Sequence, residues 1–310
     1  MRARQPDTTG RINCDGVEIY YEVHGDGGPT ILLLPTWLIL HSRFWKLQIP
    51  YLARHFRVLT YDSPGNGLSD RPLEPEAHGV YAHLRYTEAV LDETGTDSAV
   101  LVGLSQGGQF GVSFAAERPE RVDGLVGIGA AVAVLSTGPS ERRQYIMEHF
   151  EDPYPPRPPS EVRTGSRDDR GDWAKYNRKF WLDDLEDFGW FFFGHCFPEA
   201  HSTKQIEDCV GWTLETTGEI LGAEWDAPDG DIETYRNWAS AVECPVLLIH
   251  GTDDYIVPID YAKELARLTG AELVTMEGAG HIPLARDPVQ VNLLVKDFVD
   301  RVAARKVMAS

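Results

Sequence analysis

The sequence predicts an α/β protein with a mostly parallel central sheet, helices on its faces and a helical insertion. Two observations support this fold class. Short apolar runs, typical of strands buried on both faces, alternate with helical stretches through short connections. The alternation stops near residue 132 and resumes after residue 238, around a stretch of different composition. Right-handed βαβ units on both sides of this stretch would build one core, split by an insertion.

The first part of the core, residues 1–131, is expected to begin with a hairpin. The segment "RINCDGVEIYYEVHG" contains two alternating stretches around Asp15-Gly16, a pair that favours a two-residue turn. Buried strands and helices then alternate. The strands are expected at 28–35, 55–62, 98–104 and 121–131, and the helices at about 81–93 and 105–119.

The insertion, residues 132–238, is proline-rich and charged in one part and helix-like and aromatic elsewhere. It holds six of the eight tryptophans, namely Trp173, Trp181, Trp190, Trp212, Trp225 and Trp238. The second part of the core, residues 239–310, returns to strands and helices. Its strands are expected at 244–251 and 271–277, and its helices at about 259–268 and 288–304.

Charge and composition exclude several classes of function. Forty-eight acidic against twenty-nine basic residues give a formal charge of −19, which repels phosphate backbones and anionic membrane surfaces. We therefore expect neither a nucleic-acid partner nor a membrane partner. The polar start "MRARQPDTTG" has no apolar core, and the longest apolar run, "ILLLPTWLIL", is half the length of a membrane span, so the expected location is the cytoplasm. No feature specifies an oligomeric state.

Ser105 lies between two glycines directly after the apolar run "VLVGL". The pattern G-x-S-x-G also arises by chance, so it is a weak signal alone. Its position says more, because catalytic groups of parallel α/β sheets lie at the carboxyl ends of strands. A serine hydroxyl needs a base to remove its proton and a partner that orients the base. A histidine and a carboxylate are therefore expected at the same edge.

Loops after two later strands supply these groups. "HGTDDYIVP" carries Asp253 and Asp254, and "EGAGHIPL" carries His281 between glycine-rich and apolar residues beyond the last strand. The chain order is thus Ser105, then Asp253 or Asp254, then His281. An early strand is also followed by "YDSPGNGLSDRP", residues 61–72, which contains a D-x-x-G-x-G-x-S turn.

With these motifs in this order, the chain resembles the α/β-hydrolase-fold serine hydrolases. The resemblance covers about residues 12–131 and 240–305. It implies that Ser105 is the nucleophile and His281 the base. It also implies that Asp254 is the acid, because the acid in this family usually lies four residues before the proline of an x-I-V-P turn; Asp253 is the alternative. No metal and no cofactor are implied, and no nucleotide-binding motif is present.

The resemblance also implies an oxyanion hole built from backbone N–H groups. Gln106, at the start of a predicted helix, would supply one donor and Trp37 the second. The family commonly has His-Gly before the second donor, whereas this chain has Pro35-Thr36. Because proline lacks a donor and threonine lacks the backbone freedom of glycine, we expect this loop to follow a different path.

The insertion resembles the helical cap that covers the catalytic edge in this family. Its aromatic residues favour an apolar substrate, since such pockets are mainly hydrophobic. The leading hypothesis is a serine hydrolase that cleaves a small hydrophobic carboxylic ester or lactone through an acyl-enzyme. The same three residues could serve a thioesterase, an acyltransferase or a carbon–carbon bond hydrolase. An alternative of another class is a ligand-sensing protein with slow turnover, and the unusual Pro35-Thr36 loop keeps this alternative open.

Overall fold

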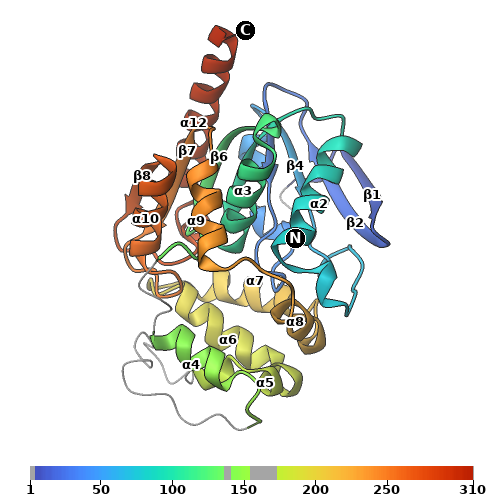
Figure 1. Ribbon diagram of the computed structural model, residues 1–310, viewed down its shortest axis with the longest axis vertical. Helices are drawn as coiled ribbons and strands as arrows, with labels where there is room; N and C mark the ends of the chain where they lie inside the picture. Colours follow the sequence, from blue (N-terminus) through green and yellow to red (C-terminus); the bar gives the residue numbers. More distant parts are fainter. Residues whose placement is uncertain (1–3, 136–140, 154–172, 310) are drawn as a thin grey trace.

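The computed structural model describes residues 4–135, 141–153 and 173–309, and within them eight strands form one sheet. The strand order is β1-β2-β4-β3-β5-β6-β7-β8 (Figure 1). β1 pairs antiparallel with β2 and β2 with β4, and the other neighbours are parallel. The strands are β1 (Thr8–Cys14), β2 (Val17–His24), β3 (Thr30–Leu33), β4 (Arg57–Tyr61), β5 (Ala99–Leu104), β6 (Val122–Ile128), β7 (Val246–Gly251) and β8 (Glu272–Met276). The predicted fold class is confirmed.

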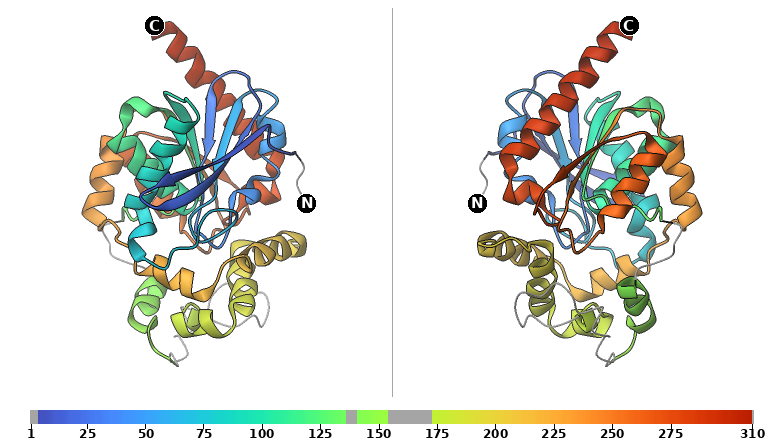
Figure 2. Two further views of the ribbon diagram at one scale, coloured as in Figure 1. Left: turned by 90° about the vertical axis from the view of Figure 1, so that its right-hand side faces the viewer. Right: turned by 90° about the vertical axis from the view of Figure 1, so that its left-hand side faces the viewer.

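Helices cover both faces of the sheet (Figure 2). One face carries α2 (Gly79–Glu93), α3 (Gln106–Glu117), α9 (Ile232–Ala241) and α10 (Ile259–Thr269), and the other carries α1 (Ile49–Leu52), α11 (Pro283–Arg286) and α12 (Pro288–Ala309). Short 3₁₀ helices lie at Ser42–Trp45, Pro75–Ala77, Pro119–Arg121 and Trp173–Lys175. Within the described ranges, no helix is both long and apolar enough to cross a bilayer.

The central strand β5 explains how two helical layers can share one sheet. All six of its residues are buried, and alternate side chains point to opposite faces. Leu101 packs in the same cluster as Phe110 of α3, whereas Val100 and Val102 pack with Val299 of α12. This central position explains the continuous apolar sequence of β5, and it makes the end of β5 a fixed point in the fold.

Five helices between β6 and β7 gather beyond the carboxyl ends of the parallel strands (Figure 1). We call them the inserted helices: α4 (Glu141–His149), α5 (Arg178–Asp183), α6 (Leu185–Cys196), α7 (Thr203–Thr213) and α8 (Gly218–Trp225). Their aromatic core is continuous with the core on the α12 face of the sheet. α9 lies instead beside α3 and α10. It crosses residue 238, and the division at residues 132 and 238 stays a prediction.

Candidate active site

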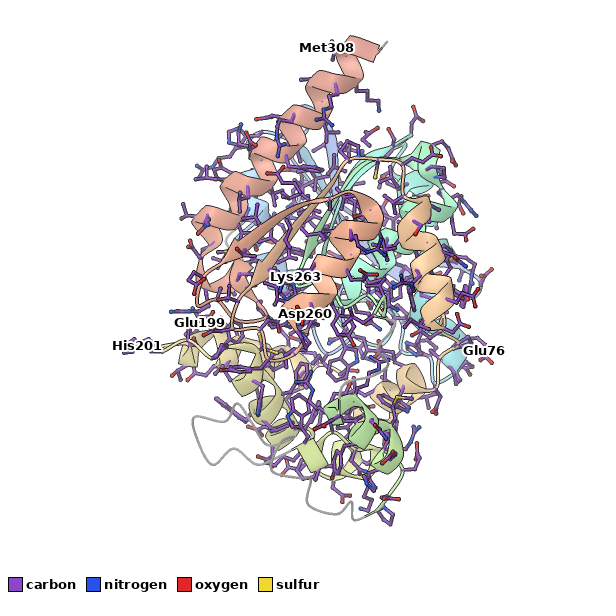
Figure 3. The ribbon with its side chains drawn as sticks, turned by 60° about the vertical axis from the view of Figure 1, so that its left-hand side comes forward. Glu76, Glu199, His201, Asp260, Lys263 and Met308 are labelled. Atoms are coloured by element: carbon purple, nitrogen blue, oxygen red, sulfur yellow. The ribbon has the colours of Figure 1, made fainter. Side chains whose placement is uncertain are left out.

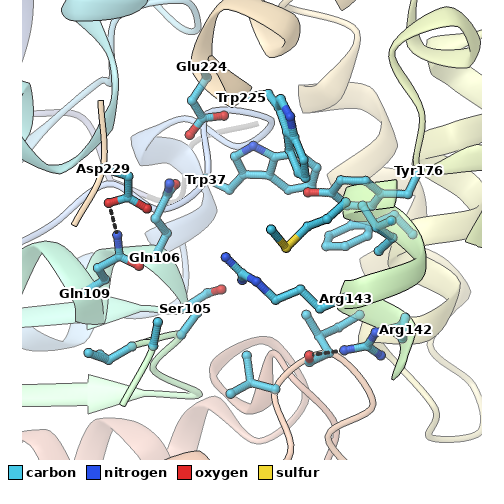
Figure 4. A pocket seen from close by; sticks show the side chains of 18 of the residues that line it. Trp37, Ser105, Gln106, Gln109, Arg142, Arg143, Tyr176, Glu224, Trp225 and Asp229 are labelled. Atoms are coloured by element: carbon cyan, nitrogen blue, oxygen red, sulfur yellow. Dashed lines mark hydrogen bonds between the residues drawn. The ribbon is translucent and has the colours of Figure 1, made fainter. Parts of the chain in front are cut away.

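Ser105 occupies a sharp turn between β5 and α3. Its backbone dihedrals are φ 53° and ψ −117°, a strained conformation for a residue with a side chain. Hydrogen bonds with the strand and loop that follow fix this turn. The Ser105 N–H donates to the Ile128 carbonyl at 2.9 Å, and the Ser105 carbonyl accepts from Ala131 at 3.0 Å. The turn directs the Ser105 side chain into a cavity (Figure 4).

Close backbone contacts explain the glycines around Ser105. A Cβ atom on Gly103 would lie 2.2 Å from the carbonyl oxygen of Gly107, and one on Gly107 would lie 2.4 Å from the carbonyl oxygen of Pro35. Both distances are too short for a side chain. The sequence pattern therefore reflects a steric requirement: the strand, the helix and the loop of Pro35 meet at this point.

His281 and Asp254 form a buried pair at the same edge of the sheet. The Nδ1 atom of His281 lies 2.8 Å from Oδ2 of Asp254, and both side chains are almost completely buried. The second oxygen of Asp254 accepts the backbone N–H groups of Ile256 and Val257, each at 2.8 Å. An ionised Asp254 thus holds a proton on Nδ1, which leaves Nε2 as the ring atom that can accept one.

The surroundings of Asp254 favour its charged form. Burial would raise its pKa, but the charge and hydrogen bond of His281, the charge of His250 and the Val257 N–H outweigh burial and lower it. Asp253, the alternative left open by the sequence, is exposed and lies outside this pair. The geometry therefore brings His281 together with Asp254.

The loop after β6 contacts both Ser105 and His281. Ala131 donates its N–H to Ser105, as described above. Gly129 lies so close to the imidazole that an added Cβ atom would be 3.2 Å from Nδ1 of His281. This loop lies between the end of β5 and the His281 loop, so it contacts the serine turn on one side and His281 on the other.

The end of α6 and the segment after it hold the His281 loop from the opposite side. The His281 N–H donates to the carbonyl of Cys196 at 3.0 Å, and the Gly280 N–H donates to Oε1 of Glu199 at 2.8 Å. A Cβ atom on Gly280 would lie 2.2 Å from Cδ of Pro198. Glu199 lies where the inserted helices meet the sheet (Figure 3). The sequence does not reveal this contact, because its partners are more than eighty residues apart.

A cavity of about 490 Å³ opens between Ser105 and the inserted helices. Aromatic rings form one side of it, from Trp37, Trp173, Tyr176, Trp181, Phe192 and Trp225. The rings of Trp37 and Tyr176 stack at a centroid distance of 5.6 Å. Arg143 also projects from α4 into the cavity (Figure 4). The guanidinium of neighbouring Arg142 donates to the carbonyls of Tyr255 and Ile256.

Gln106 and Trp37, the two predicted oxyanion donors, line the same cavity as Ser105. Gln106 is the first residue of α3, so its backbone N–H has no acceptor within the helix. The contact between Gly107 and the carbonyl of Pro35 places the loop before Trp37 against the start of α3. Both residues are therefore close to the serine turn.

Glu224, in the last turn of α8, is a cavity residue that sequence reasoning missed. Burial raises the pKa of its carboxyl to about 8, and the charge of Asp229 raises this pKa further. Hydrogen bonding with the side chains of Gln106 and Trp37 lowers the pKa but does not outweigh burial. Glu224 thus stays mostly neutral at pH 7.

Among the residues that the structure describes, no group of three His, Cys, Asp or Glu side chains could hold a metal ion.

A parallel α/β sheet with a strained serine turn, a buried His–Asp pair and a cavity at the strand ends defines a class of enzymes. The family model described as alpha/beta hydrolase fold matches residues 29–288. The chain belongs to this family, and it is a hydrolase of the α/β-hydrolase fold.

Relatives and solved structures are similar to this chain over most of its length. A putative carbamate hydrolase RutD from Caulobacter sp. (strain K31) is 28% identical over 92% of this chain and 97% of its own. A pimeloyl-[acyl-carrier protein] methyl ester esterase from Aromatoleum aromaticum is 30% identical over 87% and 98%. The crystal structure of the enol-lactonase from Burkholderia xenovorans LB400 matches with a TM-score of 0.72 and 21% identity, covering 94% and 100%.

We predict that Gly280→Ala destabilises the protein by about 1–3 kcal/mol, because the new methyl group collides with Pro198. Urea unfolding measures the free energy. Gly278→Ala is the matched control: Gly278 has a positive φ of 69° in the same loop, but nothing lies within 4 Å of its added Cβ atom. The control should lose about 1 kcal/mol. A Gly280→Ala loss no greater than that of the control would contradict the close contact.

We also predict that Glu224 lowers the free energy of unfolding as the pH rises. Its folded-state pKa of about 8 lies above the ordinary value of 4.5, so protonation stabilises the folded state at low pH and this stability is lost as the pH passes 8. Glu224→Gln removes the titration. Allowing for solvent screening in the open cavity, wild type should lose about 1–2 kcal/mol more than the variant between about pH 6 and pH 9. Urea unfolding at both pH values tests this, and equal losses would contradict it.

Proposed function

We propose that this chain is a serine hydrolase that cleaves a small hydrophobic carboxylic ester or lactone through an acyl-enzyme. The observation that carries the proposal is the buried His281–Asp254 hydrogen bond of 2.8 Å beside the strained turn of Ser105. A structural serine in a glycine-rich turn needs neither of these features. Their combination is what activation of a hydroxyl nucleophile requires.

In the proposed mechanism, Ser105 Oγ attacks the substrate carbonyl while Nε2 of His281 takes its proton. Asp254 keeps the other proton on Nδ1 and stabilises the imidazolium that forms. His281 then returns the proton to the leaving alcohol oxygen, and Ser105 carries the acyl group. Water, deprotonated by His281, attacks this ester, and collapse of the second tetrahedral intermediate releases the acid and free Ser105.

The negative charge of each tetrahedral intermediate would be stabilised by backbone N–H groups. Gln106 is the stronger candidate, because its N–H has no acceptor within α3 and the helix dipole favours an anion at this end. Trp37 is the proposed second donor. The close approach of the Pro35 carbonyl to Gly107 supports its position beside the turn, although the residues before it differ from the usual His-Gly.

The inserted helices act as the cap in this proposal. They supply Trp181, Phe192 and Trp225 of the aromatic wall of the cavity, which suits an apolar acyl or alcohol group. The Aromatoleum aromaticum relative is named a methyl ester esterase, and the Caulobacter relative a putative carbamate hydrolase. Both names describe attack on a carbonyl with an oxygen or nitrogen leaving group. A substrate panel for this chain should therefore contain alkyl esters, lactones and a carbamate.

The first test compares wild type with Ser105→Ala on p-nitrophenyl esters of increasing acyl length. We expect wild type to turn over the esters and the variant to lose about 10⁴–10⁶-fold in kcat. The acyl-length preference would measure the space inside the cavity. A fluorophosphonate probe should label wild type at Ser105 and leave the variant unlabelled. Ester turnover that survives Ser105→Ala, or a wild-type enzyme that is neither active nor labelled, would contradict the mechanism.

The second test separates the two neighbouring aspartates. Asp254→Asn should lower kcat by about 10³–10⁴-fold, because an amide can stabilise the wrong histidine tautomer and cannot balance the imidazolium charge. Asp253→Asn is the matched control, since it removes a negative charge one residue away but Asp253 is exposed and outside the pair. The control should stay within about threefold of wild type. Equal losses in both variants would argue against Asp254 as the orienting acid.

A further inference from the structure

Arg142, in the first turn of α4, holds the loop that carries Asp254. Its guanidinium donates to the carbonyls of Tyr255 and Ile256, two consecutive residues of that loop. The Arg142 side chain points to this loop at the edge of the cavity, whereas the next residue, Arg143, points into the cavity (Figure 4). The first of the inserted helices therefore reaches the loop of the proposed catalytic acid.

The two carbonyls belong to the same peptide groups whose N–H groups bind Asp254. The peptide group between Tyr255 and Ile256 accepts from Arg142 through its oxygen. Its N–H, on Ile256, donates to Oδ1 of Asp254 at 2.8 Å. The next peptide group accepts through the Ile256 oxygen and donates to the same Oδ1 through the Val257 N–H, also at 2.8 Å. Because a peptide group is planar and rigid, each one connects the guanidinium to the carboxylate as a fixed unit.

The charges at the two ends are aligned with the dipoles of these peptide groups. Each carbonyl oxygen, the negative end of its dipole, faces the cation of Arg142, and each N–H, the positive end, faces the carboxylate of Asp254. Burial lowers the pKa of the Arg142 guanidinium, and the charge of Asp254 opposes this effect. The arrangement therefore favours an ionised Asp254 in one orientation.

A guanidinium suits this position better than an ammonium would. The central carbon of the Arg142 guanidinium lies over the Trp173 ring, 4.5 Å from its centroid, while the N–H groups donate to two different carbonyls. A planar group with several donors can make these contacts together, whereas an ammonium is a single point charge. The helix dipole disfavours a cation in the first turn of α4. The contacts with the loop, and not the helix, therefore explain an arginine here.

We propose that Arg142 is a positioning residue, which acts on the reaction through these two peptide groups and Asp254. It fixes the carboxylate that orients the His281 imidazole, without touching the reacting atoms. This inference rests on the proposed function and adds a residue of the inserted helices to its machinery. The inserted helices then contribute to the activation of Ser105 and do not only cover the cavity.

The first measurement is the turnover of the best p-nitrophenyl ester by Arg142→Ala. We expect kcat to fall by about 10–100-fold and KM to stay within about threefold, because a displaced carboxylate slows the chemical step without removing a substrate contact. Arg121→Ala is the matched control. Arg121 also donates to two consecutive carbonyls, those of Thr96 and Asp97, but it lies where β5 and β6 begin, at the sheet edge opposite the site. The control should be destabilised in urea and keep kcat within about twofold of wild type.

A double-mutant cycle tests whether Arg142 acts through Asp254. In the Asp254→Asn background, Arg142→Ala should lower kcat by no more than about twofold, because residues that act as one unit do not have additive effects. The full loss in that background would show that Arg142 acts independently of Asp254, and it would overturn the inference. A loss confined to KM would also overturn it, since Arg142 would then be a substrate contact.

Arg142→Lys is measured in the same way, so that the test does not depend on the folding of the alanine variant. Lysine keeps the positive charge but has one nitrogen, on a flexible stem, for two carbonyls. We expect its kcat to stay at least about fivefold below that of wild type. A lysine variant equal to wild type would contradict the need for two fixed hydrogen bonds.

A measurement without turnover separates this inference from the proposed function. The Nδ1 proton of His281 faces a buried carboxylate, so it should give a low-field proton resonance in wild type, which Asp254→Asn should remove. Arg142→Ala should shift or broaden this resonance, and Arg121→Ala should leave it unchanged. A resonance identical in wild type and Arg142→Ala would overturn the inference, with ester hydrolysis unaffected as a separate result. If no ester is hydrolysed and Ser105 is not labelled, the hydrolase proposal fails, and the resonance still decides whether Arg142 positions the pair.

Discussion

The backbone turn at Ser105 is the constraint on which the rest of the site depends. β5 is fully buried, so its end cannot shift without disturbing both helical layers. The turn that follows puts Ser105 at a positive φ. This strain persists because the end of β6 accepts a hydrogen bond from the Ser105 N–H and Ala131 in the next loop donates one to the Ser105 carbonyl. Gly103 and Gly107 have no side chains, and this permits the close backbone contacts around the turn. Strain at the serine is thus maintained by the core.

His281, the proposed base, is held differently from Ser105, the proposed nucleophile. The His281 loop belongs to the second part of the core, yet its backbone N–H groups donate to Cys196 and Glu199 of the inserted segment. Asp254 fixes the imidazole from the core side. The position of His281 therefore depends on correct packing between the sheet and the inserted helices, whereas the position of Ser105 depends on the sheet, α3 and the loops of the first part of the core. The loop after β6 joins the two, because Ala131 contacts Ser105 and Gly129 lies against His281.

The sequence predicts those parts of the site that follow local rules. The eight strands have apolar runs or alternation, and Ser105 and His281 lie in glycine-flanked turns, so pattern and chain order locate them. The choice of Asp254 over Asp253 needed the family pattern, since both lie in one loop. Only the structure shows that Asp254 is buried and Asp253 is exposed. Glu224 has no signal of its own, because its raised pKa arises from burial between α8 and the start of α3. The packing of α9 beside α3 is likewise a tertiary property.

Two carboxyl groups near the catalytic edge have opposite protonation for physical reasons. Asp254 faces His281 and backbone N–H groups, which favour its charged form, whereas burial and the charge of Asp229 keep Glu224 neutral at pH 7. In the proposed mechanism this difference matters, because negative charge develops on the substrate oxygen beside Gln106 and Trp37. A second anion at Glu224 would repel that charge. A neutral Glu224 beside Gln106 and Trp37 adds no charge that would oppose the proposed oxyanion. In a chain with a net charge of −19, an uncharged carboxyl at this position keeps the proposed oxyanion site free of one more negative charge.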